Sequence, residues 1–364
     1  SRNRYWGTPL NVWECEGCGH QHSIGSREEL YELSGDERAK TVELHRPYID
    51  EITMKCPECG GTMHRVPEVI DCWFDSGAMP FAQHHYPFEN QDLFEKQFPA
   101  QFISEAVDQT RGWFYSLLAE STLLFNKACY ENVIVLGHVQ DENGQKMSKS
   151  KGNAVDPFEA LEKYGADAIR WYFYINSAPW LPNRFHGKAV TEGQRKFMGT
   201  LWNTYAFFTL YASIDGYDPV NQKAKSEDFS LMDKWVLSKL QSLIKFVDEG
   251  LADYKITETA RAIAAFVDEL SNWYVRRCRE RFWGKGLEGD KLAAFETLYT
   301  VLTTLCGLCA PYIPFMTETM YQNLVVNNVP GAKESVHLTD FPKADMSLVD
   351  KKLEDDMEAV IAAV

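Results

Sequence analysis

Apolar residues in the second half of the chain recur every three or four positions, which is the spacing of one face of an α-helix. Ser230 and Asp233 have the pattern of a capping box, and the helix that they open is expected to stop at Gly250. Further helices are expected over about 257–284, through the apolar positions of 295–309, and over 315–324. Helices of this kind pack antiparallel, so the pattern predicts a helical bundle.

The first half of the chain instead mixes short β-rich runs with helical stretches. Residues 132–137 form a β-branched run typical of a buried parallel strand, and residues 102–105 resemble the end of another strand, followed by a helix. Alternating strands and helices predict an α/β sheet, in which ligands collect at the carboxyl ends of the strands. Glu105 and residues 144–153 both follow such ends, so we expect them to share one site.

Length and composition narrow the class of protein. The 364 residues are enough for two domains, and 45% hydrophobic and 24% charged residues are typical of a globular protein. We expect no stretch long enough to span a bilayer and no signal core in residues 1–6, so the predicted location is cytoplasmic. The net charge of −15 argues against nucleic-acid binding through bulk charge, although a local basic stripe remains compatible with it.

Four of the nine cysteines form two Cys-x-x-Cys pairs, Cys15 with Cys18 and Cys56 with Cys59. Glycines beside each pair let the backbone wrap a metal ion. Four thiolates are the closed tetrahedral ligand set of structural Zn²⁺, so we predict a zinc ribbon over about residues 11–66.

Two alternatives to this ligand set stay open. In the first, the four cysteines would be unrelated reduced thiols that bind no metal. In the second, His20, His22 or His64 would replace one of the four thiolates. Cys306 and Cys309 have the same spacing but lie in an apolar helix, where we expect them in the core.

The run from Gly144 to Asn153 places three lysines and two hydroxyls within six residues. Lysine ammonium groups suit phosphate oxygens, and glycines let backbone N–H groups approach a charged ligand. The alternative is a solvated surface loop. The order of residues favours the phosphate site, because this run resembles the signature loop of class I aminoacyl-tRNA synthetases in five consecutive residues: Lys146, Met147, Ser148, Lys149 and Ser150.

This resemblance implies that an amino-acid carboxylate attacks the α-phosphate of ATP, bound with Mg²⁺, and that pyrophosphate leaves. Lys149 would stabilise the charge on the departing oxygens, with the other four residues of the signature assisting. A mobile loop would close on ATP and open to release the product.

Further stretches resemble the isoleucyl-tRNA synthetases within that class: residues 1–9, 72–81, 105–114, 164–172, 201–205 and 271–277. The valyl enzymes are the alternative. The resemblance implies an α/β fold, the second half of a class I synthetase nucleotide-binding (Rossmann-like) domain with the zinc-ribbon insertion, over residues 1–175. An α-helical bundle anticodon-binding domain would follow over residues 176–364.

The same resemblance assigns roles in substrate binding. Glu105 would bind the α-ammonium of isoleucine in the aminoacyl-adenylate, while Asp108 and Gln109 would contact the amino acid or the ATP ribose. Trp6 and Trp113 would wall the aliphatic pocket, with plain core packing as the alternative for each indole. Two departures from the family are Ala106 in place of glycine and Leu136 before Gly137, which leaves His138 as the adenine-site candidate.

The His-x-Gly-His element of class I enzymes does not occur in this sequence. We therefore expect a portion of a synthetase that lacks the editing domain, needs the remaining N-terminal part of the same enzyme, and does not activate isoleucine alone. A non-catalytic tRNA-binding module is the alternative.

An RNA partner, tRNA(Ile), is expected to bind a helix that alternates arginines with aromatic residues. The arginines are Arg276, Arg277, Arg279 and Arg281, which follow Trp273 and Tyr274. The alternative is a solvated helix face on which these arginines pair with nearby acidic residues.

Overall fold

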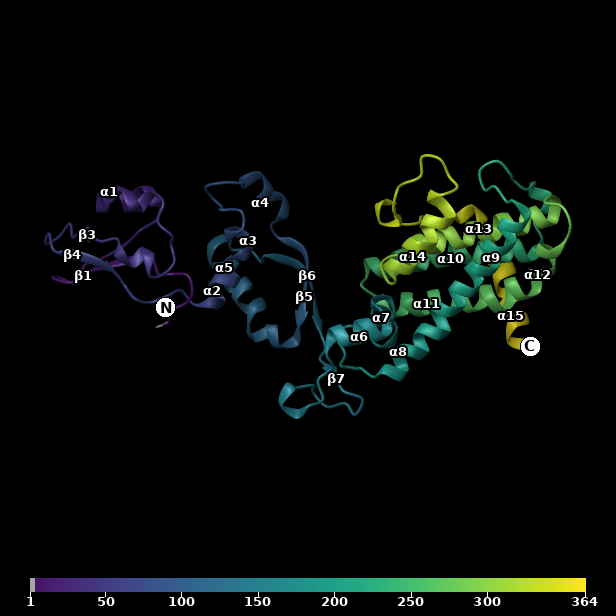
Figure 1. Cartoon of the computed structure of the whole chain (residues 1–364), viewed down its shortest axis with the longest axis horizontal. Helices are drawn as coiled ribbons and strands as arrows, with labels where there is room; N and C mark the ends of the chain where they lie inside the picture. Colours follow the sequence, from purple (N-terminus) through teal and green to yellow (C-terminus); the bar gives the residue numbers. More distant parts are fainter. Residues whose placement is uncertain (1–3) are drawn as a thin grey trace. The chain divides into compact units, whose positions relative to one another are not determined.

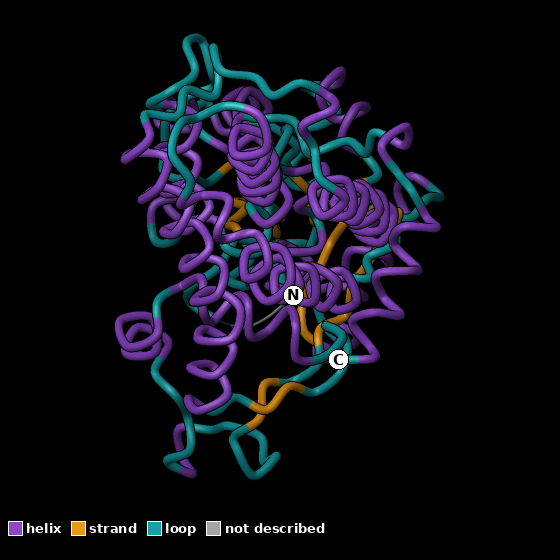
Figure 2. The backbone as a smooth tube through the Cα atoms, turned by 90° about the vertical axis from the view of Figure 1, so that its right-hand side faces the viewer, coloured by secondary structure: helices purple, strands orange, loops and turns teal. Residues whose placement is uncertain are grey.

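The computed structural model describes residues 4–364, apart from the side chain of Lys149. The chain divides into two compact units, Ser1–Val135 and Leu136–Val364. Helices account for most of the backbone, and the strands are short (Figures 1 and 2). The boundary after residue 175 expected from the sequence stays a prediction.

The first unit begins with an antiparallel sheet in the order β2-β1-β4-β3. Its strands are β1 (Val12–Cys15), β2 (Gln21–Ser23), β3 (Met54–Lys55) and β4 (Thr62–Arg65). Helix α1 (Arg27–Ser34) and the 3₁₀ turns Glu37–Lys40 and Tyr48–Glu51 fill the insertion between β2 and β3. Trp13 anchors the small core, where its indole N–H donates to the carbonyl of Ile52 at 2.8 Å. This core holds the ends of the strands that carry the two cysteine pairs.

Three short helices and a strand–helix–strand segment complete the first unit. They are α2 (Cys72–Gly77), α3 (Met79–Ala82), α4 (Gln91–Gln97), β5 (Ala100–Ala106), the 3₁₀ turn η3 (Val107–Arg111), α5 (Trp113–Phe125) and β6 (Tyr130–Leu136). β5 and β6 are neighbours in one sheet, which confirms the two predicted strands and the helix between them. The expectation of a buried strand is wrong in this structure, because only Ile134 of β6 is buried.

The second unit opens with a small α/β segment. Strands β7 (Val139–Gln140) and β8 (Asn183–Arg184) pair in parallel. Between and after them lie η4 (Lys149–Lys151), α6 (Pro157–Tyr164), α7 (Ala166–Asn176) and α8 (Gly187–Gly193). Asp156 caps α6 by accepting from the backbone N–H of Phe158 at 2.8 Å. Ala160, Tyr172, Phe185 and Val190 form a core that joins these helices to β8.

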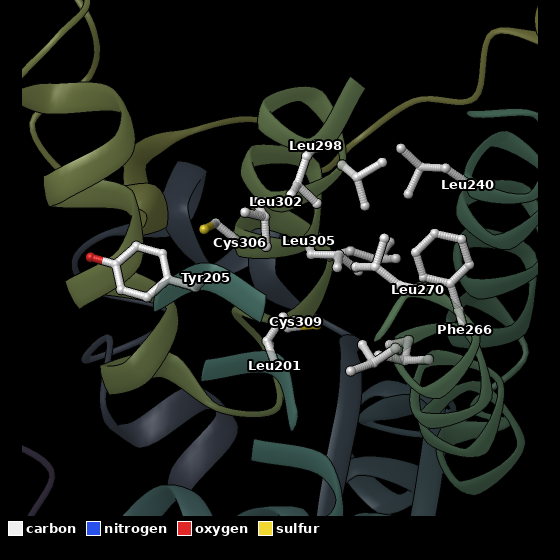
Figure 3. Packing of buried hydrophobic residues seen from close by; sticks show 14 of the residues in the cluster. Leu201, Tyr205, Leu240, Phe266, Leu270, Leu298, Leu302, Leu305, Cys306 and Cys309 are labelled. Atoms are coloured by element: carbon white, nitrogen blue, oxygen red, sulfur yellow. The ribbon is translucent and has the colours of Figure 1, made fainter. Parts of the chain in front are cut away.

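The rest of the second unit is the predicted helical bundle. Its long elements are α9 (Gly199–Asp215), α10 (Leu231–Ala252), α11 (Ile256–Glu269), α12 (Arg276–Trp283), α13 (Gly289–Cys309), α14 (Pro314–Tyr321) and α15 (Lys351–Ala363). π-helical turns at Gln194–Met198, Leu270–Val275 and Gln322–Val326 and 3₁₀ turns at Ser226–Asp228, Val336–Leu338 and Met346–Leu348 complete it. Figure 3 shows side chains of α9, α10, α11 and α13 meeting in the core, including Cys306 and Cys309 as expected.

Two details of the bundle correct the sequence analysis. The capping box of Ser230 and Asp233 forms, but α10 continues past Gly250 to Ala252. Gly250 is needed for close packing, because a Cβ there would collide with Thr259 of α11. Helix α13 is apolar and long enough to cross a membrane, contrary to our expectation that no stretch of the chain would be. In this structure, however, 67% of the most apolar 18 residues of the helix are buried inside the protein.

Candidate functional site

The lysine-rich run lies on a hairpin fastened by Asp141 and Asn153. Asp141 accepts hydrogen bonds from the backbone N–H groups of Asn143 and Gln145, at 3.0 and 2.7 Å, so it closes the turn. The amide of Asn153 donates to Asp141 at 2.8 Å, while its oxygen accepts from the backbone N–H of Ser148 at 2.9 Å. Hydrogen bonds from Asn153 and from the turn lower the pKa of Asp141, so its charged form is the one held here.

The hairpin keeps its apolar and charged residues apart. Met147 packs against the core of Tyr172 and Phe185, while Lys146 and Ser150 are exposed. The hydroxyls of Ser148 and Ser150 lie 3.1 Å apart. The side chain of Lys149, expected to carry the chemistry, lies outside the described residues. Half-buried His138 precedes β7, and its carbonyl accepts from the N–H of Asn183 at 3.0 Å.

The amino-acid-binding candidates lie in the first unit, around the end of β5. Glu105 and Asp108 are exposed. Gln109 caps α5, because its side-chain oxygen accepts from the backbone N–H of Trp113 at 2.9 Å. The indole of Trp113 donates to the carbonyl of Ser76 at 3.0 Å and so ties α5 to α2. Trp6 is 78% exposed and contacts Tyr5 edge to face at 4.9 Å between ring centres.

Glu120 of α5 is an acidic residue that the sequence analysis missed. Its side chain packs against Gly77 of α2, where a Cβ would collide with the carboxyl group. Burial raises the pKa of Glu120 to about 7, and the charge of Asp75 adds to the shift. Its Oε2 atom has no hydrogen-bond partner among the described residues. Glu120 lies three residues after buried Leu117, so helical periodicity places it on the buried face of α5, although the sequence does not show which residue it meets there.

The four cysteines of the two pairs converge at one end of the four-stranded sheet. Their sulfur atoms all lie within 4.8 Å of one another, with Cys15 at 3.5 Å from Cys59 and Cys18 at 3.6 Å from Cys56. No histidine belongs to this cluster within residues 4–364, and the imidazoles of His22 and His64 lie against Glu29 and Glu16 instead.

Backbone N–H groups of Gly17 and Gly61 donate to the sulfur atoms of Cys15 and Cys59, each at 3.4 Å, and favour the thiolate forms. Hydrogen bonds from the N–H groups of Cys18 and Gly17 lower the pKa of Cys15 to about 7. The N–H of His20 acts on Cys18 in the same direction, but the neighbouring sulfurs and burial raise the pKa of Cys18 to about 12. Four thiolates therefore need a cation among them, and four sulfurs at this spacing fit a tetrahedral Zn²⁺ site.

Three of the four candidate RNA-binding arginines are exposed on α12. The guanidinium of Arg277 lies over the ring of Trp273 at 5.1 Å, and that of Arg279 lies over Trp283 at 5.4 Å. Arg276 is exposed beside them. Stacked cations and indoles of this kind offer both charge and a flat surface to unpaired bases.

Arg281 differs from the other three arginines, because its guanidinium is only 14% exposed. It binds the buried carboxylate of Asp233 with two nitrogens, at 2.9 and 2.7 Å. It also donates to Asp290, at 2.9 and 2.8 Å, and to the hydroxyl of Ser230 at 3.2 Å. All five N–H donors are used inside the bundle, so Arg281 fastens α12 to the start of α10.

The fold and these sites are those of one class of enzyme. A family model of the class I tRNA synthetases (I, L, M and V) matches residues 1–181, and a model of the anticodon-binding domain of tRNA ligases matches residues 233–364. The chain therefore belongs to the class I tRNA synthetases, as a portion of the catalytic domain followed by an anticodon-binding domain.

Within that class, the chain is similar to isoleucine–tRNA ligases. It is 62% identical to that of Clostridium novyi (strain NT) over 98% of this chain, and 58% identical to that of Clostridium acetobutylicum over 100% of this chain. These alignments cover 34% and 35% of the relatives, so the chain spans about a third of their length.

Solved structures agree on the fold. The LeuRS of Agrobacterium radiobacter K84, in a ternary complex with tRNA and LeuAMS, superposes with a TM-score of 0.72 at 19% identity, over 96% of this chain and 42% of that one. The methionyl-tRNA synthetase of Mycobacterium tuberculosis, in complex with methionyl-adenylate, gives a TM-score of 0.57 at 16% identity, over 80% and 58%.

Proposed function

We propose that this chain is the part of an isoleucine–tRNA ligase that supplies the signature loop and the anticodon-binding bundle. The enzyme would join isoleucine to ATP, with Mg²⁺, as an aminoacyl-adenylate and then transfer isoleucine to tRNA(Ile) in the cytoplasm. The observation that carries this proposal is the fastened hairpin that presents Lys146 and the two serines of the signature.

A fastened hairpin suits the chemistry. Charge builds on the pyrophosphate oxygens as the carboxylate attacks, and cations held in place beforehand lower that barrier without reorganisation. Asp141 and Asn153 hold the base of the hairpin, so Lys146 and Lys149 start from a defined backbone position. Met147 would anchor the loop in its own core while the lysines reach the phosphates.

Contacts with the amino acid would come from the first unit. We assign Glu105 to the α-ammonium of isoleucine, because an exposed carboxylate at the end of β5 suits that cation. Asp108 would contact the amino acid or ribose, and His138 the adenine. The side-chain oxygen of Gln109 is taken by the backbone N–H of Trp113, so its amide nitrogen, now 3.4 Å from Asp108, would make the contact with substrate. Trp113 and Trp6 would wall the side-chain pocket.

The rest of the same enzyme is the proposed partner of the strand–helix–strand segment. Strands of a doubly wound sheet are normally buried on both faces, but β6 has one buried residue. Leu123 is 85% exposed, Tyr115 68% and Leu124 61%, all on α5. Exposed apolar area of this kind supports a covering segment, and the chain spans about a third of its relatives. We therefore infer that the chain alone does not form adenylate.

Zinc and RNA complete the proposal. Cys15, Cys18, Cys56 and Cys59 would hold a structural Zn²⁺ that joins the ends of the ribbon strands, with no position left open for chemistry. Arg276, Arg277 and Arg279 would contact tRNA. Arg281 is not proposed as a contact, because all of its donors are occupied.

The test is isoleucine-dependent exchange of pyrophosphate into ATP by the full-length polypeptide that carries this chain. We expect exchange with isoleucine but not with leucine or methionine, and a loss of about 10²–10³-fold in Lys149→Ala. Lys188→Ala, which removes an exposed lysine of α8, is the matched control. Undiminished exchange in Lys149→Ala, or a preference for valine over isoleucine, would overturn the proposal.

A further inference from the structure

Three chain segments lie side by side at the base of the hairpin, with Gln140 in the middle. Gln140 of β7 pairs in parallel with Arg184 of β8 and forms an antiparallel bridge with Lys146. Residues that face each other across paired strands project their side chains to the same face. Lys146 and Arg184 therefore leave the same face, on either side of Gln140.

That face is the exposed one. The next residues along the two segments, Met147 and Phe185, point the other way and pack in the core with Tyr172. Successive side chains in a strand alternate between faces. Consistent with this, both Lys146 and Arg184 are exposed.

The backbone of Arg184 is fixed from several directions. Phe185 donates its N–H to the carbonyl of Gln140 at 2.8 Å, and Asn183 donates to His138 at 3.0 Å. The Tyr172 hydroxyl donates to the carbonyl of Arg184 itself. The guanidinium lies against the turn at Gly144, where a Cβ would come within 3.1 Å of Nε. Gly144 also has φ +78°, so the turn favours glycine for both reasons.

The guanidinium of Arg184 has no protein partner within residues 4–364, neither a carboxylate nor a hydrogen-bond acceptor. The contrast is Arg281, whose five donors all have partners. The guanidinium group of Arg184 has five N–H donors in one plane and lies on the same face as Lys146, and such a pair of cations suits the oxygens of a phosphate group.

We propose that Arg184 is a phosphate-binding residue that works with Lys146 at the base of the hairpin. This inference rests on the proposed function and deepens it. Neighbouring strands lie 4.7–4.9 Å apart, so the two backbones are about 10 Å apart and both long side chains reach one polyphosphate. The phosphate belongs either to ATP and its pyrophosphate or to the tRNA backbone, and the experiment separates these sources.

The experiment compares Arg184→Gln, Arg184→Lys and the wild type in the full-length polypeptide. Arg195→Gln is the control, because it removes an exposed arginine of the same unit with the same change of side chain. Three quantities are measured: the dissociation constant for inorganic pyrophosphate by calorimetry, the KM for ATP in exchange, and the KM for tRNA in aminoacylation. Thermal melting of each variant checks folding.

We expect Arg184→Gln to weaken pyrophosphate binding and raise the KM for ATP about 5- to 20-fold, with Arg184→Lys between it and the wild type. A rise confined to the KM for tRNA supports the same phosphate chemistry with RNA as its source. Values within twofold of Arg195→Gln in all three measurements overturn the proposal. Pyrophosphate binding needs no amino acid, so this failure is distinct from a wild type that shows no isoleucine-dependent exchange.

Discussion

The side-chain amide of Asn153 joins Asp141 to the hairpin that carries the signature lysines. Its nitrogen donates to the carboxylate of Asp141 at 2.8 Å, and its oxygen receives the backbone N–H of Ser148 at 2.9 Å. One planar group at the end of the run thus bonds both the turn that precedes the run and the middle of the run. The amide nitrogen also donates to the carbonyl of Lys146 at 3.3 Å, so the backbone of the hairpin is fixed at its base while the side chain of Lys146 stays exposed.

Asn153→Ala removes both ends of this connection. Each lost hydrogen bond costs about 1 kcal/mol, but displacement of the lysines matters more, because misplacement of about 1 Å costs roughly a hundredfold in rate. We expect exchange by the full-length polypeptide to fall about 10- to 100-fold. Asn143→Ala, an exposed turn residue whose backbone alone is bonded, is the control. Equal rates for the two variants would show that the amide does not position the lysines.

Removal of a sulfur ligand tests the cysteine cluster. Cys59→Ser leaves three sulfurs and should reduce zinc in the purified protein from about one per chain to near zero, since closed sites need all four ligands. Cys72→Ser changes an exposed cysteine outside the cluster and should keep its zinc. Zinc content is measured by elemental mass spectrometry of the purified protein. Removal of the metal with a chelator should unfold the zinc ribbon around Trp13, which a change in tryptophan fluorescence would report. Zinc retained in Cys59→Ser would exclude the four-thiolate site.

Sequence patterns predicted the elements that local rules control. The capping box of Ser230 and Asp233, the helices of the bundle and the two cysteine pairs all depend on neighbours within a few residues or on fixed spacings. The Asp-x-x-Gly pattern that begins at Asp141 is typical of a β-turn, so the turn at the base of the hairpin could also have been predicted from the sequence.

What the sequence did not reveal depends on residues far apart in the chain. Arg281 binds Asp233, which lies 48 residues away in the sequence. The local pattern of basic residues on the helix therefore does not distinguish this buried, paired arginine from its exposed neighbours. Glu120 meets Gly77 across two helices, and Arg184 meets Lys146 only through Gln140. Such pairs need the packed structure, because nothing in the local pattern marks them.

The carboxyl group of Glu120 predicts a pH dependence of stability. Its pKa is raised from 4.5 to about 7 in the folded protein, so the folded state holds a proton that the unfolded state releases. Full stability is present below about pH 4.5 and is lost as the pH rises to about 7, by about 3 kcal/mol. Glu120→Gln should therefore raise the free energy of unfolding at pH 8 and flatten this part of the profile.

Urea unfolding of the chain between pH 4.5 and 8.5 measures this effect. Glu95→Gln, an exposed acid of α4, is the control and should follow the wild type. A wild-type profile that stays flat between pH 5 and 8, or a Glu120→Gln profile that matches it, would mean that Glu120 is ionised without cost.

Arg281 and Arg279 should separate stability from RNA binding on one helix. Burial raises the pKa of Asp233, but hydrogen bonds from Arg281 and Tyr274 outweigh it and hold that pKa below its usual value. Arg281→Ala leaves this buried carboxylate without its counter-charge, which costs about 3–5 kcal/mol in the free energy of unfolding. Arg281→Lys should recover little of this lost stability, because a single ammonium group cannot replace a guanidinium that makes two hydrogen bonds to Asp233.

Arg279→Ala, by contrast, removes an exposed guanidinium stacked on Trp283. Its free energy of unfolding should change by less than about 0.5 kcal/mol. Its affinity for tRNA should fall, and the slope of the logarithm of the binding constant against the logarithm of salt concentration should become shallower by about one. Urea unfolding and a salt titration of tRNA binding measure both variants. If Arg281→Ala unfolded like the wild type while losing tRNA affinity, its ion pair with Asp233 would not be what fastens α12, and Arg281 would return to the RNA surface.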